Sequence, residues 1–559
     1  MIIDYPHTIK GVTLMPIKRV VHSLIVMAGL IVLTTSGVHA QTRASVQSQD
    51  QQTIEAWGAY PSFNRSDWGP EFTIYNRPAF ETAIYDSFNL TSVRWDLQPR
   101  FNDGGTGIDQ TEIQDLKKSL LSWTSRGHTD WFMTSFTPPA QFKDPPDING
   151  STANGTETHL RIDKEADYIT FIINVLTWIK NNSLPLPVAF SLQNEPTYGP
   201  GYDGCVYTPA QYQRVCIALR QALDNAGIQA VKLIAGEGNN YGDTHTIIGD
   251  FANAQFKAAV SIVASHTYDV WSASDSYQWQ ESALMFQMGK PYWMTEYSPI
   301  YTGNGVMKDN GPTEIEWTLG GTRRILRELR HSGVVRYYYW QIYPGRGDVS
   351  DAGDGTGVAT HATSEFLLYG DQTVNWIRMG RVYQAIIKNA PAGSRVRFMT
   401  TTDPNLKASN NNWIDMIALV SPQAMTVVLV NPTAQSKNLT VDGLLGTSLN
   451  VIRPTNADNA MSVGNLTITN GETPVSLPAN SVTLLVTNKG LQNTTSAVPH
   501  ALNAVSTQIA GTSLDIANYD IQGRTLRGNM LPNGIVLTRR GAVYSATVNQ
   551  NLRHRSIER

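Results

Sequence analysis

Residues 56–384 repeat one unit, in which a short apolar run is followed by a longer amphipathic stretch. Within the stretches 168–180 and 322–331, apolar residues recur at the spacing of a helix face. The apolar runs are short enough for buried strands, and there are eight of them, at 56–60, 91–97, 131–136, 188–192, 231–235, 262–266, 292–295 and 334–341. Eight strand–helix units in about three hundred residues predict an α/β fold, a (β/α)8 TIM barrel.

A doubly wound open sheet is the structural alternative, because it is built from the same units. Open sheets that bind nucleotides carry a glycine-rich phosphate loop after the first strand. No such loop follows residues 56–60. The sequence therefore gives no support for nucleotide binding.

Beyond about residue 386 the pattern changes to short strand-like runs separated by Asn, Gly, Pro and Asp. Such runs are typical of an antiparallel β-sandwich, which we expect over 386–487, attached to a barrel over 41–385. Residues 41–55 precede the first barrel strand and could pair with the sandwich. Residues 488–510 are small and polar like a linker, and a short C-terminal β-rich piece is expected over 511–559.

The N-terminus has the three parts of a signal peptide. Lys18 and Arg19 precede an apolar run at 20–33, and small residues lead to a cleavage point after Ala40. A membrane anchor is the alternative, but the run is short for a spanning helix, and no later segment approaches a spanning length. We therefore expect residues 1–40 to be removed and the protein to be secreted or held at the cell surface, with no membrane span.

Charge is nearly balanced, with 43 basic and 46 acidic residues and a net charge of −3, so bulk electrostatics do not favour a nucleic-acid partner. The two cysteines, Cys205 and Cys216, could form a disulfide in an exported protein. Alternatively, Cys216 is a buried free thiol on a helix that begins after Thr208. Two cysteines do not make a zinc site. No metal or cofactor is implied, and a monomer is expected.

Working residues of a TIM barrel stand at the C-terminal ends of its strands. The expected strands deliver polar and aromatic residues there, namely Arg94, Asp96, Asn194, Glu195, Glu237, His266, Tyr268, Glu296 and Trp340. This set predicts a polar cleft with aromatic walls and at least two carboxyl groups.

Two of these carboxyl groups fit the chemistry of glycoside hydrolysis. That reaction needs a proton for the leaving oxygen and an anion facing the anomeric carbon. Glu195 and Glu296 follow the fourth and seventh strands, which we expect on opposite sides of the barrel, so their side chains could meet over one sugar. Either residue alone could be a solvated or ion-paired side chain. Glu237 is the rival carboxylate, and its flanking glycines favour a supporting role.

The segments SLQNEP (191–196) and WMTE (293–296) resemble the acid/base and nucleophile signatures of glycoside hydrolase family 30, a retaining family of clan A. Three further segments are similar to the same family, in order TSFTPP (134–139), SHTY (265–268) and LPANSVT (477–483). The resemblance covers about residues 56–486. It implies a double displacement with Glu296 as nucleophile and Glu195 as acid and base.

The resemblance also implies residues that bind the substrate. Asn194 would bind the sugar hydroxyl next to the reacting carbon, and His266 and Tyr268 would position Glu296 or the sugar. Arg94 would either favour the ionised form of Glu296 or form a structural ion pair. Trp340 would be either the platform under the sugar or a buried core residue.

The polysaccharide substrate is expected to be xylan, because GKPYWMTE (289–296) is similar to the nucleophile strand of the family's xylanase branch. Members that recognise glucuronate have an arginine soon after the tryptophan of the eighth strand, whereas Arg346 is offset here. Other branches cleave β-1,6-linked glucans or galactans, or act on glucosylceramide. A carbohydrate-binding protein on a hydrolase scaffold is the non-enzymatic alternative.

The tail segments YDIQGR (519–524) and LPNGI (531–535) resemble the sorting tails of bacterial proteins exported by the type IX system. This resemblance implies a secretion machinery as a partner. A small β-module that packs on the sandwich is the alternative.

Overall fold

The structure, a computed structural model, describes residues 42–61, 65, 66, 73–268, 288–298, 314–342, 367–369, 374–402, 414–454, 461–491, 535–540 and 543–548. The signal peptide expected over 1–40, the offset Arg346 and the tail segment 519–524 lie outside the described residues. None of the helices in the described part is both long and apolar enough to cross a membrane.

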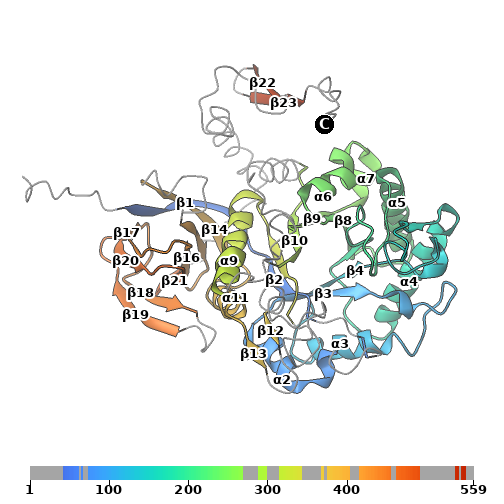
Figure 1. The fold of residues 1–559 in the computed structure, drawn as a ribbon, viewed down its shortest axis with the longest axis horizontal. Helices are drawn as coiled ribbons and strands as arrows, with labels where there is room; N and C mark the ends of the chain where they lie inside the picture. Colours follow the sequence, from blue (N-terminus) through green and yellow to red (C-terminus); the bar gives the residue numbers. More distant parts are fainter. Residues whose placement is uncertain are drawn as a thin grey trace, which may run out of the picture.

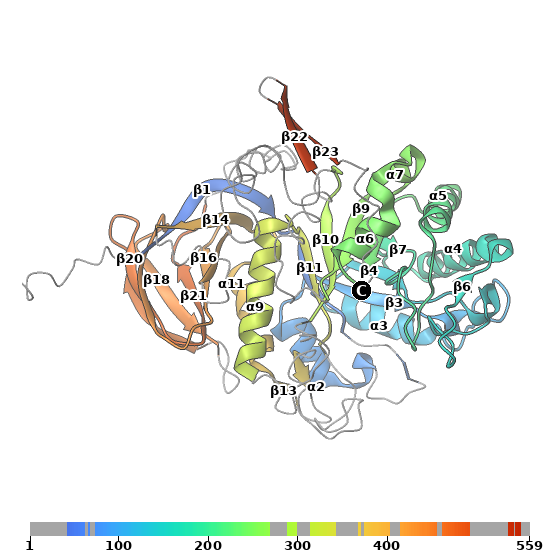
Figure 2. The same cartoon turned by 45° about the horizontal axis from the view of Figure 1, so that its top comes forward.

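Eight parallel strands close into a barrel, as the repeat of strand–helix units predicts (Figures 1 and 2). Every neighbouring pair around the ring is parallel, so the doubly wound open sheet is excluded. The order around the ring is β10-β11-β2-β3-β4-β7-β8-β9. The strands are β2 (Ala56–Ala59), β3 (Ser92–Leu97), β4 (Trp131–Ser135), β7 (Ala189–Ser191), β8 (Lys232–Gly238), β9 (Ile262–His266), β10 (Tyr292–Tyr297) and β11 (Arg336–Tyr339).

Helices between these strands cover the outside of the barrel (Figure 1). One of these helices begins after Thr208, as the sequence predicts. The Thr208 side chain caps it by accepting a hydrogen bond from the backbone N–H of Gln211, and Pro209 is its first residue. The α-helices of the described part are α2 (Pro78–Glu81), α3 (Gln114–Thr124), α4 (Glu165–Asn181), α5 (Pro209–Asn225), α6 (Tyr241–Ile248), α7 (Ala254–Ala259), α9 (Glu314–His331) and α11 (Arg378–Asn389).

The inside of the barrel is an apolar plug with a polar layer above it. The plug consists of one residue or two from each of six strands, namely Phe132, Ala189, Ile234, Ile262, Ala264, Trp293 and Tyr338. Side chains along a strand alternate, so the residue two positions further on faces the same way. In β4, β7 and β9, which have no extra residue at this level, that residue is polar: Thr134, Ser191 and His266. The plug therefore supports a floor of polar groups at the C-terminal mouth of the barrel.

A nine-stranded sheet forms the attached domain, in the order β19-β18-β21-β16-β15-β14-β1-β17-β20. Its pairings are antiparallel except that β1 runs parallel to β17. Side chains from both ends of the sheet share one apolar core, so the sheet folds over as a sandwich. Its strands are β1 (Arg43–Thr53), β14 (Arg395–Thr401), β15 (Asp415–Val420), β16 (Met425–Asn431), β17 (Lys437–Asp442), β18 (Ser448–Arg453), β19 (Met461–Thr467), β20 (Thr473–Leu477) and β21 (Ser481–Thr487).

Helices α9 and α11 lie between the barrel and this sheet (Figures 1 and 2). A largely buried ion-pair cluster fixes α9 to β15, because Asp415 accepts from Arg323 Nε at 2.5 Å and from Arg327 Nε at 3.1 Å. The C-terminal region contributes a separate antiparallel pair, β22 (Ile535–Arg540) and β23 (Val543–Val548).

The structure favours the free-thiol alternative for the two cysteines. Cys205 and Cys216 are both buried and unbridged. Burial raises the pKa of the Cys205 thiol to about 12, which keeps it protonated and unreactive at neutral pH.

Candidate active site

Two barrel strands carry an extra residue beside the polar layer, and in each case a glutamate turns inward. The pairing of β8 with β9 slips by one residue between Gly236 and Gly238, and that of β10 with β9 slips between Met294 and Glu296. Strict alternation from Ile234 would point residue 237 away from the barrel interior. The bulges instead direct Glu237 and Glu296 toward the barrel mouth.

Glycines make the bulge in β8 possible. Gly236 has a φ of +103°, and a Cβ atom there would lie 2.4 Å from the carbonyl oxygen of Ala264. A Cβ atom on Gly238 would lie 2.4 Å from the backbone nitrogen of Thr244. The glycines that flank Glu237 are thus required by the close approach of β9 and α6.

The backbone after β7 fixes the direction of Glu195. Glu195 has a left-handed φ of 47°, which is costly for a residue with a side chain. Hydrogen bonds hold it there, since the Glu195 N–H donates to the Glu237 carbonyl at 2.9 Å and the Asn194 N–H donates to the Ser135 carbonyl at 2.7 Å. The turn is therefore tied to strands on both sides, and it presents the Glu195 carboxyl to the mouth.

A fully buried arginine joins the carboxyl groups of the site. The guanidinium of Arg94 forms an ion pair with Glu296, lies 3.5 Å from Glu237 Oε1, and donates to Asn194 Oδ1 at 2.7 Å. Burial alone would lower the pKa of Arg94, but Glu237 and Glu296 raise it above its ordinary value. Arg94 thus forms an ion pair with Glu296 and also joins β3 to Glu237 in β8 and to Asn194 after β7.

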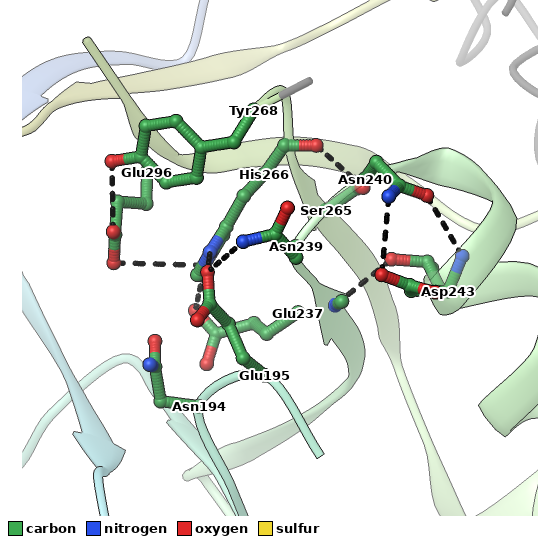
Figure 3. A network of polar contacts seen from close by, with 12 residues as sticks. Asn194, Glu195, Glu237, Asn239, Asn240, Asp243, Ser265, His266, Tyr268 and Glu296 are labelled. Atoms are coloured by element: carbon green, nitrogen blue, oxygen red, sulfur yellow. Dashed lines mark hydrogen bonds and ion pairs between the residues drawn. The ribbon is translucent and has the colours of Figure 1, made fainter. Parts of the chain in front are cut away.

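The environment of Glu195 differs from that of Glu296. Its neighbours are neutral hydrogen-bonding groups, and none of the described interactions joins it directly to Arg94. Asn239 Nδ2 donates to Glu195 Oε1 at 3.0 Å, and His266 Nδ1 lies 3.0 Å from the same oxygen (Figure 3). Burial raises the pKa of Glu195 to about 7, although the hydrogen bond from Asn239 and the charge of Arg94 act to lower it. Glu195 is therefore a carboxyl group that keeps its proton near neutral pH.

The structure gives His266 a different main partner from the expected one. Its Nδ1 contacts Glu195, whereas its Nε2 lies 3.8 Å from Glu296 and 4.0 Å from Glu237. Burial lowers the pKa of His266, so the ring is neutral at neutral pH. The imidazole of His266 thus mainly orients Glu195, and it lies within 4.0 Å of a carboxylate oxygen of each of the three glutamates.

Tyr268 contacts Glu296 as the sequence suggested, because its hydroxyl donates to Glu296 Oε1 at 2.8 Å (Figure 3). Glu195, His266 and Glu296 each have one polar atom within 4.8 Å of the other two. The two glutamates therefore converge on one small space. Their strands are not diametrically opposite as expected, since only β8 and β9 separate β7 from β10.

The same three side chains have the residue types of a metal site, but their partners are unsuited to a cation. The positively charged guanidinium of Arg94 contacts Glu296. Asn239 donates an N–H group to Glu195, and Tyr268 donates its O–H group to Glu296. A divalent cation needs free carboxylate lone pairs and is repelled by a guanidinium. The arrangement fits carboxyl chemistry better than metal binding.

Trp340 is half-buried and stands in an aromatic wall beside the carboxyl groups. Its ring centroid lies 4.5 Å from that of Tyr60 and 6.0 Å from that of Phe136. The guanidinium of Arg94 lies 5.9 Å from the Trp340 centroid. Trp340 is thus not a fully buried core residue, which favours the platform role over the alternative.

Three residues of the network were not singled out from the sequence as binding residues. Asn239 follows β8, at the barrel end where working residues gather, and this position was a usable signal. Thr134 donates to Glu237 Oε2 at 3.1 Å and accepts from Arg94. It begins the family-like segment 134–139, but nothing in the sequence marks it as a partner of these two residues. Glu237 has the supporting position that its glycines suggested.

A scan against models of protein families gives no match for this chain, and a search of curated proteins gives none. Among solved structures, the chain is similar to a glycoside hydrolase family 30 subfamily 8 xylanase from Clostridium acetobutylicum, with a TM-score of 0.60 and 21% identity over 79% of this chain and 99% of that one.

Two further structures are similar over comparable lengths. One is a conserved exported protein from Bacteroides fragilis, with a TM-score of 0.62 and 14% identity over 79% of this chain and 99% of that one. The other is an endo-β-1,6-glucanase, with a TM-score of 0.55 and 17% identity over 80% of this chain and 95% of that one. At these identities the likeness establishes the fold, a TIM barrel with an attached β-sandwich.

The buried Glu195 predicts a pH-dependent stability difference. Its pKa is about 7 in the folded protein and 4.5 unperturbed, so the stability that its neutral form contributes is complete below pH 4.5 and is lost as the pH rises through about 7. We expect Glu195→Gln, which cannot ionise, to gain roughly 3 kcal/mol in free energy of unfolding relative to the wild type over that window.

Urea denaturation of both proteins at a series of pH values measures this difference. The exposed Glu157, changed to Gln, is the control and should follow the wild type at every pH. A difference between Glu195→Gln and the wild type that stays constant from pH 4.5 to 7 would show that Glu195 titrates as an ordinary carboxyl group.

Proposed function

We propose that this chain is a secreted, retaining glycosidase of glycoside hydrolase family 30 that cleaves a β-linked polysaccharide, with xylan as the first candidate. One observation carries the proposal. Glu195 and Glu296 have oxygens within 4.8 Å of each other, and their surroundings differ in charge. Carboxyl groups about 5–5.5 Å apart are typical of retaining enzymes, whereas inverting enzymes need roughly 6.5–9.5 Å for a water molecule between them.

In the first step, a carboxylate oxygen of Glu296 attacks the anomeric carbon. The bond from that carbon to the glycosidic oxygen breaks, and its electron pair leaves with the oxygen, which takes the proton of Glu195. The products are a glycosyl ester on Glu296 and a free leaving alcohol. The raised pKa of Glu195 suits this acid role, since the group still holds its proton near neutral pH.

In the second step, Glu195 is a carboxylate and removes a proton from water. The water oxygen attacks the anomeric carbon, and the ester bond breaks with its electrons returning to Glu296. Two inversions give net retention at the anomeric carbon. Arg94 and Tyr268 stay bound to Glu296 through both steps and stabilise the carboxylate that is regenerated.

Asn194 supports the positioning of the sugar. Its carbonyl oxygen accepts from Arg94, so its amide N–H groups are the part left for the substrate. An N–H donor beside the acid fits the hydroxyl next to the reacting carbon. Hydrogen bonds to that hydroxyl strengthen in the transition state and contribute to the rate.

The proposed substrate and location rest on the similar structures and on the N-terminal sequence. The similar structures include a xylanase and an endo-β-1,6-glucanase, and both act on β-linked polysaccharides. The basic and apolar start of the chain, together with the likeness to an exported protein, supports secretion. The tail at 511–559 is proposed to be read by a secretion machinery.

The reaction is tested by product analysis on xylan, glucuronoxylan, β-1,6-glucan and β-1,6-galactan in parallel. We expect one of them to release reducing ends, and we expect Glu296→Gln to lower that rate by roughly a thousandfold or more, because the nucleophile is lost. Glu157→Gln should keep the wild-type rate. A rate that survives in Glu296→Gln contradicts the assignment, and saturable glycan binding with no turnover in the wild type favours the carbohydrate-binding alternative.

The pH dependence tests the acid. We expect kcat/KM to fall as the pH rises through about 7, since Glu195 loses its proton there. Asn239 lowers the pKa of Glu195, so Asn239→Ala should move this decline to higher pH. Asn253 caps α7 away from the site, and Asn253→Ala should cost about 1 kcal/mol of stability but leave the decline in place. A decline that is identical in all three proteins would assign it to another group.

A further inference from the structure

A fourth carboxyl group, that of Asp96, lies near the mouth of the barrel and takes no part in the steps above. Alternation along β3 puts Arg94 and Asp96 on the same inward face. Arg94 is occupied by the glutamates, whereas no described interaction joins Asp96 to them. Asp96 keeps 9% of its surface exposed, while Arg94 has none.

Asp96 is held against the aromatic wall. The hydroxyl of Tyr60 donates to Asp96 Oδ1 at 3.0 Å, and Tyr60 itself is buried. The Tyr60 ring packs on Trp340 and on Phe136, with centroid distances of 4.5 and 6.2 Å. A sugar lying on Trp340 would therefore have Asp96 beside one of its edges.

The ring order of strands shows which edge this is. Glu195, His266 and Glu296 come from β7, β9 and β10, on one side of the barrel. Trp340 follows β11, which lies diametrically opposite β7 in the ring. The next strands after β11 are β2, which Tyr60 follows, and β3, which carries Asp96. Because Glu195 gives its proton to the leaving oxygen, the leaving group lies on its side. The sugar that is transferred then extends the other way, over Trp340 toward Asp96.

The charge of Asp96 limits what can bind there. Burial raises its pKa to about 6, while the hydrogen bond from Tyr60 and the charge of Arg65 lower it and that of Asp203 raises it. Above that pH the group is a carboxylate, which accepts charge-assisted hydrogen bonds from hydroxyl groups. A uronate carboxylate in the same place would be repelled.

We propose that Asp96 is a specificity-determining residue of this site, where its carboxylate accepts hydrogen bonds from hydroxyl groups of a neutral sugar on the transferred side. This inference rests on the proposed function and deepens it by naming the class of sugar. It favours an unsubstituted, neutral unit next to the cleaved bond over a uronate.

The test uses Asp96→Asn, which keeps the size of the side chain and removes its charge. On the glycan that the wild type cleaves, we expect KM to rise on the order of tenfold or more, with a smaller change in kcat. Glucose and glucuronate, which differ only at C6, where glucose has a hydroxymethyl group and glucuronate a carboxylate, serve as competing inhibitors. The inhibition constant of glucose should rise in the variant, and that of glucuronate should fall.

Two further variants separate binding from folding. Tyr60→Phe removes the hydrogen bond to Asp96 and should shift both inhibition constants in the same directions by a smaller factor. Asp130 bonds Ser92 and Arg336 outside this network, and Asp130→Asn should leave both constants unchanged. Opposite shifts for the two inhibitors cannot come from a general loss of structure.

Other outcomes overturn the inference. Unchanged constants in Asp96→Asn, or equal shifts for glucose and glucuronate, would show that Asp96 has only a structural role. In that case the proposed function stands, because the wild type still cleaves its glycan. If the wild type cleaves no glycan of the panel, the proposed function fails and the role of Asp96 fails with it.

Discussion

The buried charge of Arg94 is the constraint on which the site depends. A guanidinium without solvent contact requires compensating anions, and removing one partner of such a pair commonly costs 3–5 kcal/mol. Glu237 and Glu296 supply the anions, and Thr134 and Asn194 supply further acceptors. One cation therefore fixes groups from β3, β4, β7, β8 and β10 in one geometry. It also makes the two proposed catalytic carboxyls unequal, since Glu296 shares the cation directly and Glu195 does not.

The second constraint is the pair of bulges. An apolar plug fills the barrel, and the polar layer follows two residues later along β4, β7 and β9. In β8 and β10 strict alternation would have turned the glutamates away, and the extra residue in each strand brings them back. Gly236 and Gly238 allow this in β8, because side chains there would overlap β9 and α6. The two bulges thus bring Glu237 and Glu296 into the site that the regular barrel would not form.

Much of the fold could be predicted from the sequence, because its signals are local. All eight barrel strands lie within the expected apolar runs or extend them by a few residues, as β8 does to Gly238. Two sandwich strands, β14 and β20, have only a weak local signal, since charged and proline residues interrupt their apolar character. The pairing of β1 with β14 and β17 depends on residues more than three hundred positions apart, and no local pattern specifies its parallel register with β17. Similarly, Glu195 and Glu296 stand at predictable strand ends, but the preference of His266 for Glu195 depends on sub-ångström geometry.

The central claim is that Glu296 forms a covalent bond to the sugar while Glu195 handles the proton. Trapping the intermediate tests it most directly. A 2-deoxy-2-fluoro glycoside of the cleaved sugar, with a good leaving group, slows the second step more than the first, so the glycosyl-enzyme accumulates. Mass spectrometry of the digested protein should then find the fluorosugar on the peptide that contains Glu296. A label on Glu195 or Glu237, or turnover of the glycan with no label at any residue, would contradict the account.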